Sequence, residues 1–322
     1  MSETVSLDCP SPRSPVDPPP VRLGFVGLGN IGGPMAVSLA TWHGGLTVFD
    51  LSPEAVDTVV GAGATPADSL EELAACADII GICVVDDAQV RAVVGGLLSA
   101  SAATGNVSAS AATGNVSGVA PGTIITVHST ISPETATELA AQCAEQGVIL
   151  LDAPVSGGAP GAQQGRLAIM VGGDRAAYQK LKEPFASTAD LIVHAGDEVG
   201  AGTRMKLARN LLHFISFTAA TEASRLAEAA GVDIVKLGTV VRHTDAITGG
   251  AGAIMLRDTT AEIARDDFWY GVFTHVRGLG EKDLSLALAL GDELGVDLPL
   301  GTIARRDLAA GLGVPHHVRR ER

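Results

Sequence analysis

The fold of this chain is decided by residues 21–35, which read V-R-L-G-F-V-G-L-G-N-I-G-G-P-M. The apolar first part of this stretch, residues 23–26, predicts a buried strand, and residues 33–40 are typical of a helix. Between them, residues 27–32 match G-x-G-x-x-G. A strand, a glycine-rich turn and a helix in this order form the usual context of a dinucleotide-binding site.

Each glycine of the turn has a separate structural role. Gly27 permits the tight turn, Gly29 lets a pyrophosphate approach the backbone, and Gly32 lets the helix pack closely on the strand. The N-terminus of the helix then presents unpaired N–H groups to the phosphates. The alternative is a glycine-rich turn without a ligand, since the chain contains 39 glycines.

An acidic residue at the expected distance favours the dinucleotide interpretation. Residues 46–50 read L-T-V-F-D, which predicts a second strand that ends in Asp50, 18 residues after Gly32. A carboxylate at this position accepts hydrogen bonds from the adenosine ribose hydroxyls. Asp50 also favours NAD over NADP, because it would repel a 2′-phosphate and no arginine follows it directly.

The composition argues against several other classes of protein. With 322 residues, of which 46% are hydrophobic, the chain can form one large or two medium-sized domains. The formal net charge of −14 argues against a nucleic acid partner. No apolar run reaches the roughly 18 residues of a membrane span. The four cysteines lack metal-ligand spacing, so we expect reduced thiols in a cytoplasmic protein without a metal site.

Three segments are expected to lie outside the folded core. Residues 1–20 contain six prolines and predict a disordered tail without the features of a signal peptide. Residues 99–107 and 108–116 are both S-A-S-A-A-T-G-N-V, which predicts a duplicated surface loop. Residues 315–322 are expected to form a second tail.

Further apolar segments continue an alternation of strands and helices. Residues 78–85 predict a buried parallel strand, and the acids that follow it are interpreted as a helix start. Residues 123–128 predict the next strand, which is followed by Ser129 and Thr130. Beyond a strand at 148–152, the hydroxyl of Ser156 and the N–H groups of the following glycines would suit a carboxylate, although an ordinary loop is equally compatible.

The sequence pattern changes at Gly200. Residues 203–230 lack proline and glycine and predict a helix of about 28 residues, long enough to connect two domains. Further helical patterns follow at 233–243, 251–265 and 278–295. The sequence therefore predicts an α/β Rossmann domain over residues 21–199 and an all-helical C-terminal domain over residues 200–314, joined by a long interdomain helix.

Lys206 and Asn210 are four residues apart, so they share one face of the predicted long helix. A lysine near the start of this helix can exchange a proton with a substrate hydroxyl, while hydride moves to or from a nicotinamide ring. Lysine has an ordinary pKa of about 10.4 and is then a poor base, but burial and a cationic nicotinamide both lower that pKa. Spacing alone is also compatible with a solvated lysine on a helix face.

Four motifs resemble the β-hydroxyacid dehydrogenase family and occur in the family's order. They read G-F-V-G-L-G-N-I-G-G-P-M-A from Gly24, D-A-P-V-S-G-G from Asp152, G-A-G-T-R-M-K-L-A-R-N from Gly200 and E-K-D-L-S-L-A-L from Glu281. The family includes 3-hydroxyisobutyrate dehydrogenases, tartronate semialdehyde reductases and glyoxylate/succinic semialdehyde reductases. The resemblance covers about residues 22–312. It implies a small carboxylate substrate and a helical domain that forms homodimers or homotetramers.

The resemblance also implies roles for individual residues, with Lys206 as the catalytic acid/base. The substrate-binding residues expected in this chain are Ser156, Gly157, Gly158, Asn210, Thr130 and His275. The expected cofactor-binding residues are Gly27, Gly29, Asn30, Ile31, Gly32, Asp50, Val84, Val85, Thr130 and Lys282.

Three positions depart from the family pattern. The usual pair of asparagines after the lysine is Arg209-Asn210 here. The usual aspartate before Ser-Thr is His128, which we interpret as a structural histidine rather than a general base. His275 stands where the family often has a substrate-facing phenylalanine. An arginine or histidine near the substrate would bind a second anionic group of that substrate.

The function expected from these features is NAD-dependent interconversion of a short 3-hydroxy acid and its semialdehyde. An imine reductase is an alternative with the same architecture, but such enzymes commonly lack the lysine. A 6-phosphogluconate dehydrogenase is disfavoured, because the chain is short for one and lacks a basic cluster for a phosphate. A nucleotide-binding protein without catalysis is the third alternative, and Lys206 and Asn210 argue against it.

Overall fold

The computed structural model describes residues 20–102 and 119–316. Most of the predicted N-terminal tail, residues 103–116 of the duplicated segment and residues 317–322 therefore lie outside the described residues. Residues 99–102, which were expected in a surface loop, form the end of helix α4 (Asp87–Ala102) instead. The chain divides into two compact units, unit 1 (residues 1–207) and unit 2 (residues 208–322).

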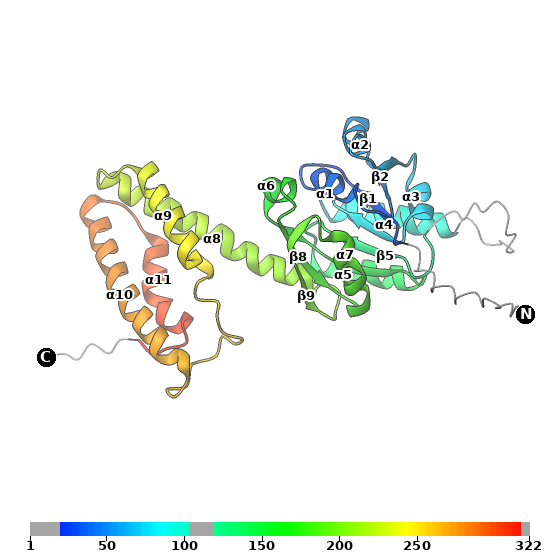
Figure 1. Ribbon diagram of the computed structural model, residues 1–322. Helices are drawn as coiled ribbons and strands as arrows, with labels where there is room; N and C mark the ends of the chain where they lie inside the picture. Colours follow the sequence, from blue (N-terminus) through cyan, green and yellow to red (C-terminus); the bar gives the residue numbers. More distant parts are fainter. Residues whose placement is uncertain (1–19, 103–118, 317–322) are drawn as a thin grey trace, which may run out of the picture. The chain divides into compact units, whose positions relative to one another are not determined.

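Unit 1 is built on a nine-stranded sheet with the strand order β3-β2-β1-β4-β5-β6-β8-β7, and β9 pairs with β8 (Figure 1). Strands β1 to β6 pair in parallel in the Rossmann order, whereas β8 is antiparallel to β6 and β7. The strands are β1 (Leu23–Val26), β2 (Leu46–Phe49), β3 (Thr65–Pro66), β4 (Ile79–Ile82), β5 (Ile124–Val127), β6 (Ile149–Asp152), β7 (Val155–Ser156), β8 (Leu167–Gly172) and β9 (Ala189–Gly196).

Helices cover both faces of this sheet and bury two apolar cores. One core contains Phe25, Met35 and Phe185, and the other contains Ile80 and Leu139. The helices are α1 (Gly32–Leu39), α2 (Pro53–Val60), α3 (Leu70–Cys76), α4 (Asp87–Ala102), α5 (Pro133–Ala144), α6 (Gly158–Gln163) and α7 (Arg175–Phe185). The predicted α/β Rossmann fold is thus confirmed.

Helix α8 (Ala201–Ala229) is the long helix predicted from the sequence, and its 29 residues begin in unit 1 and continue in unit 2. The fully buried carboxylate of Asp152 caps its start, where Oδ1 accepts the Gly200 N–H at 2.7 Å and Oδ2 accepts the Thr203 N–H at 2.6 Å. Only glycine fits at Gly202, since a Cβ there would lie 2.1 Å from the Met170 carbonyl oxygen. The start of α8 is therefore held tightly against β6 and β8.

Unit 2 is helical, as predicted, with a small core formed by Ile263, Phe273, Leu312 and Val314. Besides the later part of α8, it contains α9 (Ile234–Thr248), the 3-10 helix η1 (Gly250–Gly252), α10 (Phe268–Leu294) and α11 (Pro299–Gly311). The buried Glu222 carboxylate of α8 accepts the N–H groups of Leu300 and Gly301 and so caps α11.

The helix predicted over residues 251–265 is wrong, because only the short η1 turn forms there. Gly249, at φ 88°, ends α9 in the left-handed conformation. Farther along, the Thr259 hydroxyl accepts the N–H of Ala261, a local bond that competes with helix formation. Helix α10 in turn starts ten residues before the predicted residue 278, where Asp267 caps it by accepting the Trp269 N–H at 2.7 Å.

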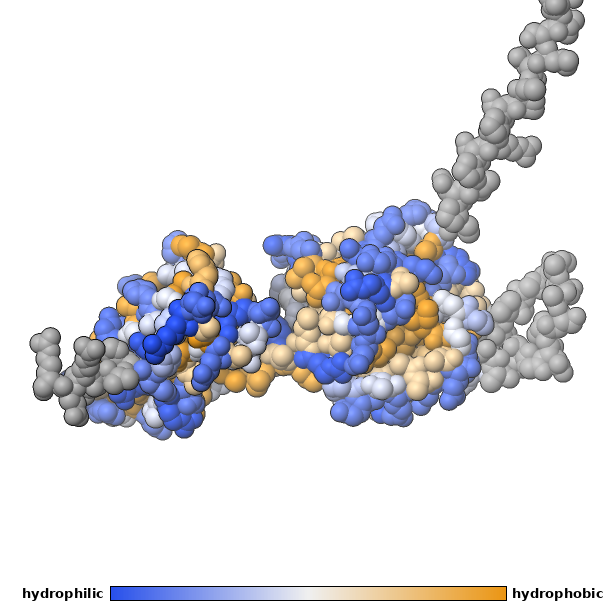
Figure 2. Space-filling view, turned by 90° about the horizontal axis from the view of Figure 1, so that it is seen from below, coloured by the Kyte–Doolittle hydropathy of each residue, from blue (hydrophilic) through white to orange (hydrophobic). Residues whose placement is uncertain are grey.

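The helices of unit 2 leave many apolar side chains exposed, and hydrophobic surface is visible in Figure 2. Helix α9 buries none of its residues, and Val235 and Ile247 are each 72% exposed. On α8, Phe214 and Phe217 are more than half exposed. None of the helices within residues 20–102 and 119–316 has the length and apolarity needed to cross a membrane.

Candidate active site

The glycine turn after β1 has the geometry of a phosphate-binding turn. Gly27 has φ 91°, and a Cβ on Gly32 would lie 2.0 Å from the Gly27 carbonyl oxygen, so the turn and α1 pack too closely for side chains. A Cβ on Gly29 would meet no atom within 4 Å, so the backbone at Gly29 faces open space. Open space beside the N-terminus of α1 suits a pyrophosphate.

Asp50 connects the glycine turn to the start of α2. Its Oδ2 accepts the N–H of Leu28 at 2.6 Å, and its Oδ1 accepts the N–H of Ser52 at 2.8 Å. A carboxylate has about four lone-pair sites, so two remain for the ribose hydroxyls. The half-buried Asp50 and the open Gly29 therefore fit a bound dinucleotide.

The ends of β4 and β5 are tied together by side chains. The Ser129 hydroxyl accepts the N–H of Val84 at 2.9 Å and donates to the Val84 carbonyl at 2.8 Å. The Asp87 carboxylate accepts the Thr135 hydroxyl at 2.5 Å and the Ser132 N–H at 3.0 Å, and these bonds lower the pKa of Asp87. Next to Ser129, Thr130 is exposed at this sheet edge. Asp87 starts α4, as predicted, and also fixes the start of α5.

Lys206 meets the D-A-P-V-S-G-G segment within unit 1. The residue is 8% exposed, and its Nζ donates a hydrogen bond to the Ser156 Oγ at 2.8 Å, across 50 residues of sequence. Ser156 ends β7, where it pairs with Ala168 of β8. Gly157 and Gly158 then adopt positive φ values and lead into α6. The structure therefore places a buried amine, a hydroxyl and two glycines in one part of unit 1.

His128 lies in the core of unit 1, in agreement with the structural interpretation. It is 2% exposed, and its ring lies 5.9 Å from that of Phe25 and 5.1 Å from that of Phe185. Its Nδ1 is 2.9 Å from the Ala153 carbonyl oxygen. Burial lowers the pKa of His128 to about 4, so its imidazole is neutral at pH 7.

Three predicted site residues belong to unit 2. Asn210 follows Lys206 on α8, and its Oδ1 accepts a hydrogen bond from Arg209 Nη1 at 3.3 Å. His275 and Lys282 are exposed residues of α10, and Lys282 Nζ lies 3.1 Å from the Asp283 carboxylate.

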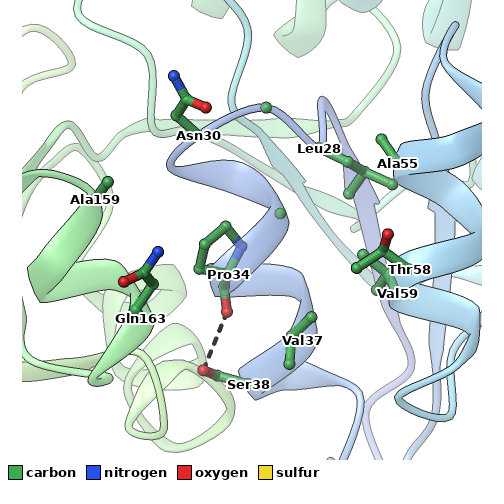
Figure 3. A pocket seen from close by; sticks show the side chains of 12 residues that line it. Leu28, Asn30, Pro34, Val37, Ser38, Ala55, Thr58, Val59, Ala159 and Gln163 are labelled. Atoms are coloured by element: carbon green, nitrogen blue, oxygen red, sulfur yellow. Dashed lines mark hydrogen bonds between the residues drawn. The ribbon is translucent and has the colours of Figure 1, made fainter.

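A cavity of about 510 Å³ runs along the outer side of α1, with Gly29 and Asn30 in its lining (Figure 3). Pro34 and Val37 of α1 contribute to its lining, α2 contributes Thr58, and α6 contributes Ala159 and Gln163. None of the residues that line it is Asp50, Ser156 or Lys206. The cavity therefore adjoins the glycine turn but does not contain the amine–hydroxyl pair.

Fold and site together define a dinucleotide-binding oxidoreductase with a Rossmann unit and a helical unit. Residues 22–196 match the NAD-binding domain of 6-phosphogluconate dehydrogenase, and residues 200–314 match the NAD-binding domain of NADP-dependent 3-hydroxyisobutyrate dehydrogenase. The chain belongs to the β-hydroxyacid dehydrogenase family, whose members are NAD(P)-dependent.

Three curated relatives illustrate this membership. An uncharacterized oxidoreductase of Mycobacterium tuberculosis is 54% identical over 92% of this chain and 94% of its own length. A 2-(hydroxymethyl)glutarate dehydrogenase of Eubacterium barkeri is 32% identical over 90% and 89%. A 3-hydroxyisobutyrate dehydrogenase of Pseudomonas aeruginosa is 34% identical over 88% and 89%.

Solved structures agree with the fold. The crystal structure of an oxidoreductase from Mycobacterium avium 104, named without a substrate, has a TM-score of 0.84 and 53% identity, over 92% of this chain and all of that one. An imine reductase from Pseudomonas sp. has a TM-score of 0.63 and 22% identity, over 91% of this chain and 96% of that one. The second likeness shows a shared fold alone.

Proposed function

We propose that this protein is an NAD-dependent dehydrogenase that interconverts a short 3-hydroxy acid and its semialdehyde, with Lys206 as the general acid/base. The observation that carries the proposal is the contact between the Lys206 amine and the Ser156 hydroxyl within the nucleotide-binding unit. An enzyme that oxidises an alcohol needs a proton acceptor at the hydroxyl, and a buried, positioned amine can supply it.

Each side chain has a defined part in this proposal. A bound oxidised nicotinamide cofactor would supply the acceptor for the hydride of the carbinol carbon. Lys206, as the neutral amine, takes the hydroxyl proton during oxidation and returns it during reduction. Ser156 holds the lysine amine in place, and the N–H groups of Gly157 and Gly158 bind the carboxylate. The remaining proposed substrate contacts come from Asn210, Thr130 and His275.

The proposed cofactor site follows the carboxyl ends of the parallel strands. The backbone at Gly29, Asn30 and Ile31 binds the pyrophosphate, and Asp50 binds the adenosine ribose and selects NAD over NADP. The remaining proposed cofactor contacts are Gly27, Gly32, Val84, Val85, Thr130 and Lys282.

The names of the relatives support this substrate class. They include 3-hydroxyisobutyrate, L-threonate and 2-(hydroxymethyl)glutarate dehydrogenases, and an L-serine dehydrogenase that is NAD-dependent. 3-Hydroxyisobutyrate, 2-(hydroxymethyl)glutarate and L-serine share a hydroxymethyl group on the carbon that bears a carboxylate. We propose that this HOCH2–C–COO− unit is what Lys206 and the Ser156 segment recognise.

The proposal is tested by cofactor reduction with purified protein, with NAD and NADP separately, over a panel of 3-hydroxy acids. Lys206→Ala should lower kcat roughly 100- to 10,000-fold while NAD still binds. Lys180→Ala is the matched control, because Lys180 is an exposed lysine on α7 of the same unit. A fully active Lys206→Ala protein would refute the acid/base role.

Adding cyclic imines and the reduced cofactors to this panel separates the alternatives. Reduction of cyclic imines, with no turnover of any hydroxy acid, would favour the imine reductase alternative. Cofactor binding without turnover of either class would favour a nucleotide-binding protein without catalysis.

We further propose that the protein forms a homodimer or homotetramer through unit 2. The exposed apolar side chains of α8 and α9 support this proposal, because helix α9 buries none of its own residues. An isolated helix of 15 residues is marginal in water, so its apolar face needs a partner surface.

A further inference from the structure

We infer that Arg209 makes this enzyme specific for 3-hydroxy acids that carry a second carboxylate on the C2 substituent. The inference rests on the proposed function, and it deepens that function by naming the substrate class. It assigns to Arg209 the binding of the second carboxylate, three residues after the proposed acid/base Lys206 on the same helix.

The position of Arg209 on α8 carries the first part of the argument. Helix α8 is continuous from Ala201 to Ala229, so its own geometry relates the residues along it. At about 100° and 1.5 Å per residue, Arg209 lies about 60° around the helix from Lys206 and about 4.5 Å farther along it. Asn210 lies about 40° to the other side. A group bound at Lys206 is thus within reach of a long side chain at position 209.

The charge of Arg209 is not neutralised within the described part of the chain. No carboxylate there lies within 4.0 Å of its guanidinium, whereas Arg204, on the same helix, pairs with Glu198 at 3.5 Å. The protein has 36 acidic and 22 basic residues, so acidic partners are abundant in the chain. An exposed arginine without a carboxylate partner, near the proposed acid/base, fits an anionic ligand.

The hydrogen bond between Arg209 and Asn210 determines which of their polar groups remain available to a ligand. Because the Asn210 Oδ1 accepts from Arg209 Nη1, the Asn210 amide N–H groups remain as donors. Arginine presents five N–H donors in a planar fork that matches a carboxylate, and this bond uses one of them. Arg209 and Asn210 can therefore each donate hydrogen bonds to a different acceptor group. An asparagine at position 209 could also donate hydrogen bonds, but it would not carry the positive charge.

A comparison of two hydroxy acids tests the contribution of the second carboxylate alone. Both 3-hydroxyisobutyrate and 2-(hydroxymethyl)glutarate carry a hydroxymethyl group and a carboxylate on C2. They differ only in the remaining substituent, which is a methyl group in the first and a carboxyethyl group in the second. The inference predicts that the wild-type protein has the higher kcat/KM with 2-(hydroxymethyl)glutarate.

The test compares Arg209→Gln with wild type on both compounds with NAD. The substitution should lower kcat/KM for 2-(hydroxymethyl)glutarate roughly 10- to 100-fold, mainly through KM, because a charge-assisted hydrogen bond is lost. The value for 3-hydroxyisobutyrate should change less than about threefold. Arg204→Gln, which removes another exposed arginine of α8, should leave both values unchanged. A wild-type preference for 3-hydroxyisobutyrate, or equal losses on both compounds, would overturn the inference.

A binding measurement separates failure of the inference from failure of the proposed function. If no hydroxy acid of the panel turns over, the proposed function fails. Calorimetric titration of the NADH-bound protein with unreactive 2-methylglutarate then tests the role of Arg209 by itself. Binding that weakens at least roughly tenfold in Arg209→Gln supports the anion site. Equal binding by the two proteins, or no binding by wild type, refutes it.

Discussion

The Asp152 carboxylate, at the end of β6, accepts the backbone N–H of Thr203 in the first turn of α8 at 2.6 Å. Its other oxygen accepts the N–H of Gly200 at 2.7 Å, and the whole side chain is buried. Lys206 follows Thr203 by three residues. The position of the proposed acid/base therefore depends on a capping carboxylate that lies 51 residues before Thr203, at the end of β6.

We predict that Asp152→Asn destabilises the protein by about 2–3 kcal/mol, because an amide N–H2 would replace one acceptor and leave a buried N–H unpaired. Asp174→Asn makes the same change at the exposed N-cap of α7, where the amide oxygen can still accept the Ala177 N–H and the new N–H2 faces water, and should cost about 1 kcal/mol or less. Urea unfolding followed by circular dichroism measures both losses. Equal losses would show that the start of α8 is held no more strongly than that of α7.

The role of Asp50 in cofactor choice is tested by Asp50→Ser. We expect the ratio of kcat/KM with NAD to that with NADP to fall at least roughly tenfold, because the repulsion of a 2′-phosphate is removed. Asp57→Ser, at an exposed carboxylate of α2, should leave the ratio unchanged. A wild-type protein that prefers NADP would overturn the assignment.

The buried His128 predicts how stability depends on pH. Its folded-state pKa is lowered from 6.5 to about 4, so between these values the unfolded chain binds a proton that the folded protein does not. The free energy of unfolding should therefore fall by roughly 3 kcal/mol as pH drops from 6.5 to 4.

His128→Asn should reduce the slope of the free energy of unfolding against pH over this window. Asparagine keeps a donor for the Ala153 carbonyl but does not titrate. The comparison uses slopes, since loss of the ring contacts with Phe25 and Phe185 lowers stability at every pH. Parallel curves for the two proteins would contradict the prediction.

The proposed oligomer predicts a change of mass in solution. Phe217→Glu places a charge in the exposed apolar surface of α8 and should convert the wild-type dimer or tetramer to a smaller species. Leu191→Glu, at a 53% exposed residue of β9 in unit 1, should not. Sedimentation velocity measures the mass, and a monomeric wild-type protein would refute the proposal.

Much of unit 1 follows from local sequence signals. The apolar residues 23–26 predict a strand that is buried on both faces. The glycines of the turn are required by close contacts with residues a few positions away. The N-caps Ser52 and Ser69 are local features of the same kind, since a cap and its N–H partner are neighbours in sequence. Family motifs predicted Lys206 and Ser156 as site residues, but only the fold shows that their side chains are in contact.

The features that were missed depend on contacts between distant residues. From the sequence, Asp152 cannot be distinguished from other acidic residues at strand ends, because its role as a cap depends on the packing of α8 against β6. The short antiparallel strand β7 lies in a segment for which the sequence also allowed an ordinary loop. The false helix over residues 251–265 arose because small apolar residues there match a helical period. The Thr259 hydroxyl and the left-handed Gly249 instead stabilise an irregular segment.

The boundary between the two units has an evolutionary consequence. Lys206, Ser156 and the glycine turn all belong to unit 1, and the cap on α8 comes from a strand of the same unit. Arg209, Asn210 and His275 belong to unit 2. If Lys206 and Ser156 have the proposed roles, mutations in unit 2 would change which acid is recognised while the proposed proton-transfer pair is inherited intact. Such a division would let a lineage acquire new substrates by small steps.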